Sequence, residues 1–402
     1  MTPLSLIDAD SLLSEEELAV REVVRRLLDE QVRPHLARWY EDASLPAREL
    51  AKRFGALGLL GMHLHGYGCA GASAVAYGLA CLELEAADSG IRSLVSVQGS
   101  LAMFAIARYG SAEQKQQWLP PMATGDVIGC FGLTEPDHGS DPAAMATRAR
   151  RDGTDWVLHG TKMWITNAPV ADVAVVWARA SAGSAGSAGS AGPAGVPGEI
   201  LGFVVPLTSP GVTVNEIHHK LSLRASLTGE VVLDEVRLPA SAQLPEAAGL
   251  RAPLSCLTEA RYGLAWGALG AARDCLETTI AYAGDRVQFG RPIAAFQLTQ
   301  AKLADMAVEL QKGFLLALHL GRLADAGRLR PEQVSVGKLN NVREALEIAR
   351  QCRTILGANG ISLEYPVLRH ANNLESVLTY EGTSEIHQLV IGQQLTGISA
   401  FA

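Results

Sequence analysis

The sequence has few cysteines and no motif that would combine them into a metal site or a disulfide framework. Its six cysteines are scattered over 402 residues without a Cys-x-x-Cys pair, and its ten histidines include no His-Glu-x-x-His motif. The adjacent His218 and His219 lie among polar residues and are expected to be solvated. No Gly-x-Ser-x-Gly elbow supports a nucleophilic hydrolase. We therefore expect free, mostly buried thiols, no metal site and a cytoplasmic location.

Positive charge is also scarce. The chain has 34 Lys and Arg against 42 Asp and Glu, a net charge of −8, which argues against a nucleic-acid partner. No apolar run approaches the roughly 18 residues of a membrane span, since the best candidate, residues 314–323, is interrupted by His319 and Arg322. The first twenty residues lack the basic, apolar pattern of an export signal. We expect no membrane insertion.

What the chain does have is apolar residues, 48% of the total, in three regions of different periodicity. Residues 12–128 and 253–402 show helical spacing, and Ser14 with Glu17 forms a capping box before the first helix. Helices are also expected over 75–87 and 94–109. Residues 129–240 instead contain short strands at 156–158, 163–165, 173–177, 201–206 and 230–233. The pattern predicts an N-terminal helical domain (1–128), a middle β-domain (129–240) and a C-terminal helical domain (241–402).

Two glycine-rich stretches have ordinary explanations. Residues 181–198 repeat Ser-Ala-Gly and are expected to form a flexible hairpin loop between two strands. Gly66, Gly68 and Gly71 fit the Gly-x-Gly-x-x-Gly pattern of a dinucleotide site, but no good strand precedes them and no parallel strand follows. A turn between two helices is the favoured interpretation, with the dinucleotide site as the alternative.

Three further stretches contain residue types that a hydrophobic core does not need. Residues 131–141 are rich in small and hydroxylic residues, which let backbone N–H groups approach a flat or phosphorylated ligand. Trp164 and Thr166 are two apart, so a strand places an aromatic ring and a hydroxyl on one face. Glu381 precedes Gly382 in a helical context, where glycine costs stability and suggests close approach of a ligand.

Taken together in this order, these stretches resemble the acyl-CoA dehydrogenase family and, within it, the glutaryl-CoA dehydrogenases. The resemblance runs from about residue 15 to residue 402. Its strongest motifs are CFGLTEPDHGSDP (130–142), KMWITNAP (162–169), LRASLTGE (223–230), ARYGLAWGALGA (260–271), DRVQFGRPI (285–293) and TYEGTSEIH (379–387). It implies an N-terminal all-α domain, a middle β-domain and a C-terminal four-helix bundle, in a homotetramer.

The resemblance also implies a reaction and a cofactor. Family members bind FAD, oxidise the α and β carbons of an acyl-CoA thioester and pass electrons to an electron-transferring flavoprotein. Glu381 matches the family's base, which removes the α-proton, and its backbone N–H helps to bind the thioester oxygen. An apolar, dehydrated site is expected to raise the pKa of Glu381. In the glutaryl-CoA group the product then loses its distal carboxylate to give crotonyl-CoA.

Site residues follow from the motif matches. Arg92 matches the residue that holds the distal carboxylate, with Glu85 orienting it and Ser96 nearby; an Arg–Glu pair that only ties two helical turns together is the alternative. Further substrate contacts are implied for Ser140, Thr258, Arg261, Tyr380 and Gly382. Flavin contacts are implied for Phe131, Leu133, Thr134, Gly139, Ser140, Trp164, Ile165 and Thr166, for Thr383 and Glu385, and, from a neighbouring subunit, for Arg286, Phe289, Gln297, Leu356 and Gly357.

The chain departs from the family pattern at several positions. Ala358 replaces the second glycine of the usual Gly-Gly-Asn-Gly, and Gly99 stands where close relatives carry serine. The loop around residues 65–73 is also unusual. These departures leave open a different dicarboxylyl group or a carrier-protein thioester as the substrate. They also leave open a flavin-binding homologue without dehydrogenase activity and a helical scaffold protein without flavin.

Overall fold

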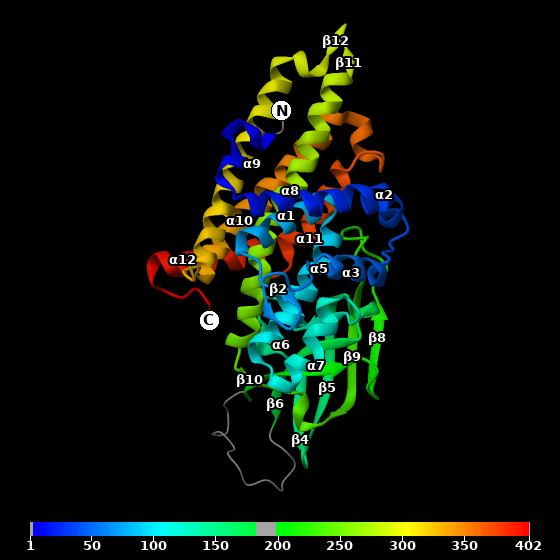
Figure 1. Cartoon of the computed structure of the whole chain (residues 1–402), viewed down its shortest axis with the longest axis vertical. Coiled ribbons are helices and arrows are strands. Elements are labelled where there is room, and N and C mark those ends of the chain that lie inside the picture. Colours follow the sequence, from blue (N-terminus) through cyan, green and yellow to red (C-terminus); the bar gives the residue numbers. More distant parts are fainter. Residues whose placement is uncertain (1–2, 182–197, 402) are drawn as a thin grey trace.

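The computed structural model describes residues 3–181 and 198–401, and it has the three regions in the expected order. Figure 1 shows the sheet at one end of the molecule and, at the other, the hairpin that joins two long helices of the C-terminal region. The N-terminal helices lie between these ends. The repeat at 181–198, expected to be a loop, falls almost entirely outside the described residues.

The N-terminal region is helical, as expected. Its helices are α1 (Glu15–Gln31), α2 (Arg33–Glu41), α3 (Ala47–Ala56), α4 (Ala74–Ala87), α5 (Ser89–Ser96), a π-helical segment (Val97–Met103), α6 (Phe104–Tyr109) and α7 (Ala112–Ala123). The capping box at the start of α1 is confirmed, because the Ser14 hydroxyl accepts a bond from the Glu17 N–H and the Glu17 carboxylate accepts one from the Ser14 N–H. These bonds satisfy N–H groups that a helix start otherwise leaves unpaired.

The glycine motif at residues 66–71 is a turn between helices. It forms a two-stranded hairpin, β1 (His65–Gly66) and β2 (Cys69–Ala70), between α3 and α4. Gly66, Gly68 and Gly71 all have positive φ. This geometry supports the turn and not the dinucleotide site, which needs a parallel strand–helix–strand unit.

The described residues of the middle region form one eight-stranded sheet. Its strands are β3 (Gly129–Gly132), β4 (Arg148–Asp152), β5 (Asp155–Thr166), β6 (Val173–Ser181), β7 (Ile200–Pro206), β8 (Val212–Glu216), β9 (Thr228–Leu238) and β10 (Gln243–Ala248). Their order is β10-β7-β6-β4-β5-β9-β8, with β3 parallel to β6. The sheet therefore extends to Ala248, past the expected boundary at residue 240, because β10 pairs with β7.

The C-terminal region is a bundle of long helices. It comprises α8 (Arg251–Asp285), α9 (Gln297–Asp325), α10 (Pro331–Leu356), α11 (Val367–Thr379) and α12 (Ser384–Thr396), with the β11 (Val287–Gln288) and β12 (Arg291–Pro292) hairpin between α8 and α9. A continuous apolar core joins this bundle to the N-terminal helices. Gly270 of α8 permits the contact with α4, because a Cβ there would lie 1.8 Å from the Leu82 carbonyl oxygen.

The structure bears on two further expectations, the state of the cysteines and the presence of a long apolar helical segment. All six cysteines are free and five are buried. Within the described residues, one helical segment, Ser89–Tyr109, is long and apolar enough to cross a membrane, although the sequence analysis had singled out residues 314–323 instead. In the structure 89% of its most apolar window is buried inside the protein, as for a core helix.

Candidate active site

A buried arginine is the centre of the first group of site residues. Arg92 of α5 is 1% exposed, and its Nε donates to Glu85 Oε2 of α4 over 2.6 Å. Its Nη1 donates to Ser96 Oγ over 2.8 Å, and its Nη2 donates to the hydroxyl of Tyr380. Three of the five guanidinium N–H groups are thus used, which leaves two for a ligand. The structure brings together four predicted substrate residues.

Glu381, the predicted base, lies beside this network in the turn between α11 and α12. Its φ is 54°, in the left-handed region that residues other than glycine rarely adopt. Its Oε2 atom is buried and has no hydrogen-bond partner among the described residues. Burial raises the pKa of Glu381, while the charges of Arg92, Lys338 and Arg261 oppose that shift. A buried carboxyl with a raised pKa and an unoccupied oxygen is suited to accept a proton.

Two cations from the bundle hold the backbone of this turn. Arg261 Nε of α8 donates to the Glu381 carbonyl oxygen over 2.6 Å. Lys338 Nζ of α10 donates to the Gly382 carbonyl oxygen over 2.5 Å and to that of Tyr380. Arg261 was predicted as a substrate contact, whereas Lys338 was not predicted as a site residue. The available signal was a lysine within the apolar stripe of α10, between the buried Val334 and Val342.

Two other titratable groups beside Glu381, Tyr380 and His387, are uncharged at neutral pH. Burial raises the pKa of the Tyr380 hydroxyl to about 12, with Arg92 opposing the shift, so the phenol stays protonated at neutral pH. Burial, helped by the charges of Lys338 and Arg261, lowers the pKa of His387 to about 3. The Nδ1 atom of His387 lies 3.0 Å from Ser335 Oγ, and its Nε2 has no hydrogen-bond partner among the described residues. Glu381 and His387 thus both present a buried, unpaired polar atom.

The second group of predicted residues surrounds the end of β3 and of β5. Trp164 is 57% exposed and has a φ of 63°, at a bulge in the pairing of β5 with β9. Thr166 is half-buried. Ile165 between them is 3% exposed and packs in the sheet core, so only its backbone can contact a cofactor. The indole and the hydroxyl thus both lie on the side of the strand away from the core.

The loop after β3 is fixed by a buried ion pair that the sequence analysis did not assign. Lys162 Nζ lies 2.8 Å from Glu135 Oε1 and donates to the Leu133 carbonyl oxygen over 3.1 Å. Glu135 also accepts bonds from the backbone N–H groups of Ala146 and Thr147. The charge of Lys162 and these bonds overcome burial and hold the pKa of Glu135 at about 2. Of the predicted contacts here, Phe131 and Leu133 are buried, Thr134 is half-buried, and Gly139 and Ser140 are exposed.

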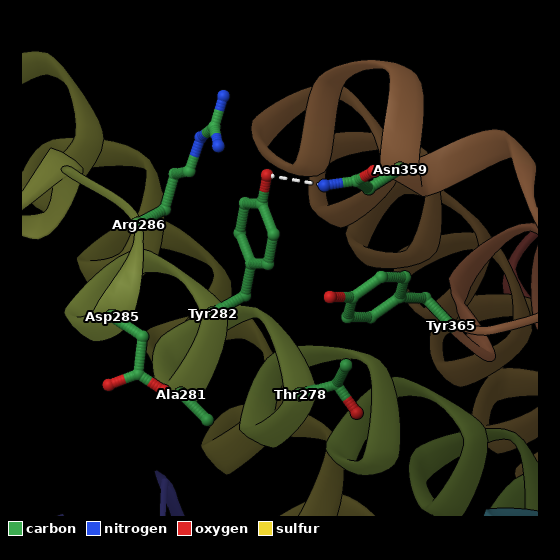
Figure 2. A pocket seen from close by; sticks show the side chains of 7 residues that line it. All are labelled: Thr278, Ala281, Tyr282, Asp285, Arg286, Asn359 and Tyr365. Carbon is green, nitrogen blue, oxygen red and sulfur yellow. Dashed lines mark hydrogen bonds between the residues drawn. The ribbon is translucent and has the colours of Figure 1, made fainter. Parts of the chain in front are cut away.

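The third group of predicted residues lies far from the sheet. Arg286, at the end of α8, lines an open pocket of about 470 Å³ with Tyr282, Asn359 and Tyr365 (Figure 2). Asn359 Nδ2 donates to the Tyr282 hydroxyl over 2.9 Å, and the two tyrosine rings meet edge to face. A guanidinium, an amide and aromatic edges fit a ligand that has phosphate groups and a heterocycle.

The remaining predicted residues lie outside these three groups or offer only their backbone to a ligand. Phe289 is 94% exposed in the β11–β12 hairpin, and Gln297 is exposed at the start of α9. Leu356 is 2% exposed, so its side chain belongs to the core and only its backbone is available. Gly357, with a φ of 60°, ends α10 and is exposed. Thr258 donates its hydroxyl to Leu254 of its own helix, Thr383 caps α12, and Glu385 is exposed in the first turn of α12.

Comparison with known proteins decides what this arrangement represents. Family models described as the N-terminal, middle and C-terminal domains of acyl-CoA dehydrogenase match residues 14–126, 130–236 and 247–396. The chain belongs to the acyl-CoA dehydrogenase family. The predicted fold class is thereby confirmed, and an oxidoreductase acting on a CH–CH bond replaces the scaffold alternative.

Individual relatives cover almost the whole of this acyl-CoA dehydrogenase. The short-chain specific acyl-CoA dehydrogenase of Bos taurus mitochondria is 36% identical over 95% of this chain and 90% of its own length. Two crystal structures of glutaryl-CoA dehydrogenase from Mycobacterium smegmatis, one in complex with FADH2, are 64% and 67% identical. They match with TM-scores of 0.94 and 0.95 over the full length of both chains.

Proposed function

We propose that this protein is an FAD-dependent glutaryl-CoA dehydrogenase that releases CO2 and forms crotonyl-CoA. The observation that carries the proposal is the buried Arg92, paired with Glu85 and bonded to the hydroxyl of Tyr380, the residue before Glu381. A guanidinium with two N–H groups to spare favours an acyl chain that ends in a carboxylate and disfavours a plain fatty chain. The high identity to glutaryl-CoA dehydrogenases supports the same substrate.

Glu381 is the proposed base. Its unpaired Oε2 accepts the α-proton of the thioester, and the raised pKa matches its proton affinity to that task. Arg261 holds the carbonyl oxygen of Glu381. The backbone N–H of Glu381 would donate to the thioester oxygen, where negative charge develops. Tyr380 and Arg92 orient the distal carboxylate. When the bond to it breaks and CO2 leaves, the electron pair of that bond passes into the conjugated thioester, and protonated Glu381 returns a proton to the γ-carbon to give crotonyl-CoA.

The residues fit FAD at two places. The exposed Trp164 indole beside Thr166, with the loop from Phe131 to Ser140, would hold the flavin ring, and the Arg286 pocket would hold the adenosine diphosphate end. When bound, FAD supplies the acceptor for the β-hydride. Thr383, directly after the turn of Glu381, would lie near the cofactor and the base together.

The separation of these two places supports an assembly of at least two subunits, and the homotetramer is proposed from the family resemblance. Arg286 directly precedes the β11–β12 hairpin, which lies at the opposite end of the molecule from the sheet (Figure 1). One FAD therefore needs residues of two subunits, as the family resemblance implies. Light scattering of the purified protein tests this proposal, and a monomer that retains FAD would contradict it.

An electron-transferring flavoprotein is the proposed electron acceptor, as membership of the family suggests. A reducing cytoplasm is the proposed location, and the six free thiols support it. Cell fractionation tests the location, and reduction of the purified flavoprotein by the substrate-reduced enzyme tests the partner.

The decisive experiment is dye-coupled turnover of the purified yellow protein on glutaryl-CoA, with the product identified by mass. Crotonyl-CoA is the expected product. Glutaconyl-CoA would keep the dehydrogenation and contradict the decarboxylation. No product on free glutaryl-CoA, with turnover of another dicarboxylyl-CoA or of a carrier-bound acyl group, would assign a different substrate to the same site.

A further inference from the structure

The turn that carries the proposed base has an unusual set of backbone partners. The carbonyl oxygens of Tyr380, Glu381 and Gly382 are consecutive, and each accepts a bond from a cationic side chain of another helix. Arg261 of α8 holds the middle one, and Lys338 of α10 holds the two that flank it. A single ammonium group therefore bridges the carbonyl oxygens of the two residues that flank Glu381.

This turn needs such support because its backbone is strained. Glu381 has a φ of 54° and Gly382 a φ of 96°. A glutamate in the left-handed region is disfavoured and persists only where its surroundings determine it. A Cβ on Gly382 would lie 3.1 Å from both Arg261 Nη2 and His387 Nε2, so the turn is also packed closely against the bundle.

Lys338 has no evident role other than this one. The residue is 2% exposed, and within the described part of the chain its ammonium makes no ion pair with a carboxylate. Burial lowers the pKa of Lys338, whereas the negative charge of Glu381 raises it. A buried amine that bonds only to backbone carbonyls costs free energy in the fold, which a purely structural role would not require.

We propose that Lys338 is a positioning residue for the base: its ammonium fixes the strained turn that presents Glu381 to the substrate and contributes positive charge beside the carboxylate. Two of its three N–H groups are occupied by carbonyls of the turn, so its proposed effect on the base passes through the turn. This inference rests on the proposed role of Glu381 as the base.

Several charged groups face Glu381 and must be considered together. Arg92 of α5, Lys338 of α10 and Arg261 of α8 lower the pKa of its carboxyl group, while Glu85 of α4 raises it. His387 of α12 also lies against the turn and is neutral above about pH 3. Loss of Lys338 removes one of three cations, so the pKa of Glu381 is expected to rise.

The test is Lys338→Met in the FAD-loaded enzyme, which keeps the volume of the side chain and removes its charge and donors. With glutaryl-CoA we expect kcat to fall by about tenfold or more while KM changes by less than about threefold, because the turn moves relative to the bound substrate. The acid limb of the pH profile of kcat/KM is expected to shift to higher pH. Lys312→Met, which removes an exposed lysine of α9, is the matched control and should behave as wild type.

Two further variants separate positioning from folding. Lys338→Arg keeps the charge and should restore part of kcat and the wild-type acid limb of the pH profile. Lys338→Gln keeps an NH2 donor group without the charge and should retain the shifted acid limb. If Lys338→Met does not fold, the pH profiles of Lys338→Arg and Lys338→Gln are compared instead, because only the first variant keeps the positive charge. A wild-type pH profile in FAD-loaded Lys338→Met or Lys338→Gln would overturn the proposal, even if stability falls.

Glu381→Gln is measured in parallel to keep the two proposals apart. Retained turnover in Glu381→Gln would show that the base assignment itself is wrong. An inactive Glu381→Gln with an unchanged Lys338→Met would contradict only the role of Lys338.

Discussion

At the scale of single residues, charge in a buried place is what distinguishes this site from an ordinary core. Arg92 and Lys338 are both almost fully buried, yet Arg92 donates to three side chains and Lys338 donates to two backbone carbonyls. The bonds of Arg92 leave two of its N–H groups for a ligand. Lys338 does not bond to the carboxylate of Glu381, whose Oε2 atom stays unpaired among the described residues. Each residue therefore has a distinct measurable consequence.

Glu381→Gln is expected to retain FAD and thioester binding and to lose turnover by about 10²–10⁴-fold, because only the proton acceptor is removed. Dye-coupled kinetics and titration with a thioester ligand check the two properties separately. Turnover within about tenfold of wild type, equivalent to only about 1.4 kcal/mol in the barrier, would contradict the assignment.

Arg92→Gln is expected to impair glutaryl-CoA far more than butyryl-CoA, because only the former has a distal carboxylate to pair with the guanidinium. The ratio of kcat/KM for the two substrates should fall by about tenfold or more. Equal losses on both substrates would indicate that the Arg92–Glu85 pair only ties α4 to α5. Arg108→Gln, an exposed arginine of α6, is the control.

At the scale of elements, the approach of α4 to α8 brings Glu85 and Arg92 close to the turn that α10 supports. This approach depends on glycines of α8 that face α4, since a Cβ on Gly267 would lie 2.1 Å from Glu85 Oε2 and one on Gly270 would lie 1.8 Å from the Leu82 carbonyl oxygen. Helix propensity alone would favour alanine at both positions. Close packing against α4, and not helix propensity, therefore explains why glycine stands at these two positions of α8.

Gly270→Ala is expected to destabilise the protein by about 1–3 kcal/mol or more, because the clash is with backbone that cannot rotate away. Thermal unfolding measures the loss. Gly284→Ala on the same helix is the matched control, since a Cβ there meets no atom within 4 Å, and it should be neutral or stabilising by up to about 1 kcal/mol. Equal effects of the two substitutions would mean that α4 and α8 are farther apart than in this structure.

At the scale of the whole molecule, the N-terminal helices and the C-terminal bundle share both a core and a buried ion network. Glu83 of α4 is 1% exposed and accepts bonds from Arg273 of α8 over 2.6 and 2.7 Å and from Arg25 of α1. Against the opposing effect of burial, Arg273 and Arg25 lower the pKa of Glu83 to about 2. This group therefore links two regions that are far apart in the sequence.

The network predicts a pH-dependent stability. Because the folded pKa of Glu83 lies below its usual value of 4.5, its contribution is present above about pH 4.5 and is lost as the pH falls toward about 2. Glu83→Gln should cost on the order of 3 kcal/mol at pH 7, and the difference from wild type should shrink on acidification. Urea unfolding at several pH values checks this, with the exposed Glu22→Gln as control. A loss independent of pH would point to packing instead.

Much of the local structure could be predicted because it depends on neighbouring residues. The capping box at Ser14 and the helix expected over 75–87, found at Ala74–Ala87, need only nearby atoms. The two strands expected at 156–158 and 163–165 are one bulged strand, β5, because bulges interrupt the alternation of buried and exposed residues. Strand β10, with the sequence QLPEAA, has weak alternation and a proline, so its pairing with β7 was not predicted.

The residues of the candidate site also fall into those that the sequence predicted and those that only the structure identified. Motifs were sufficient to propose Glu381, Arg92, Trp164 and Arg286, since a family resemblance is carried by residue types at fixed spacing. Lys338 and Lys162 were not assigned, because each acts on a backbone carbonyl that only the packed structure brings within reach. Tertiary structure also decided that Ile165 and Leu356 turn their side chains into the core. Periodicity and motifs are properties of neighbouring residues, whereas burial and contacts between distant helices arise only once the chain has packed.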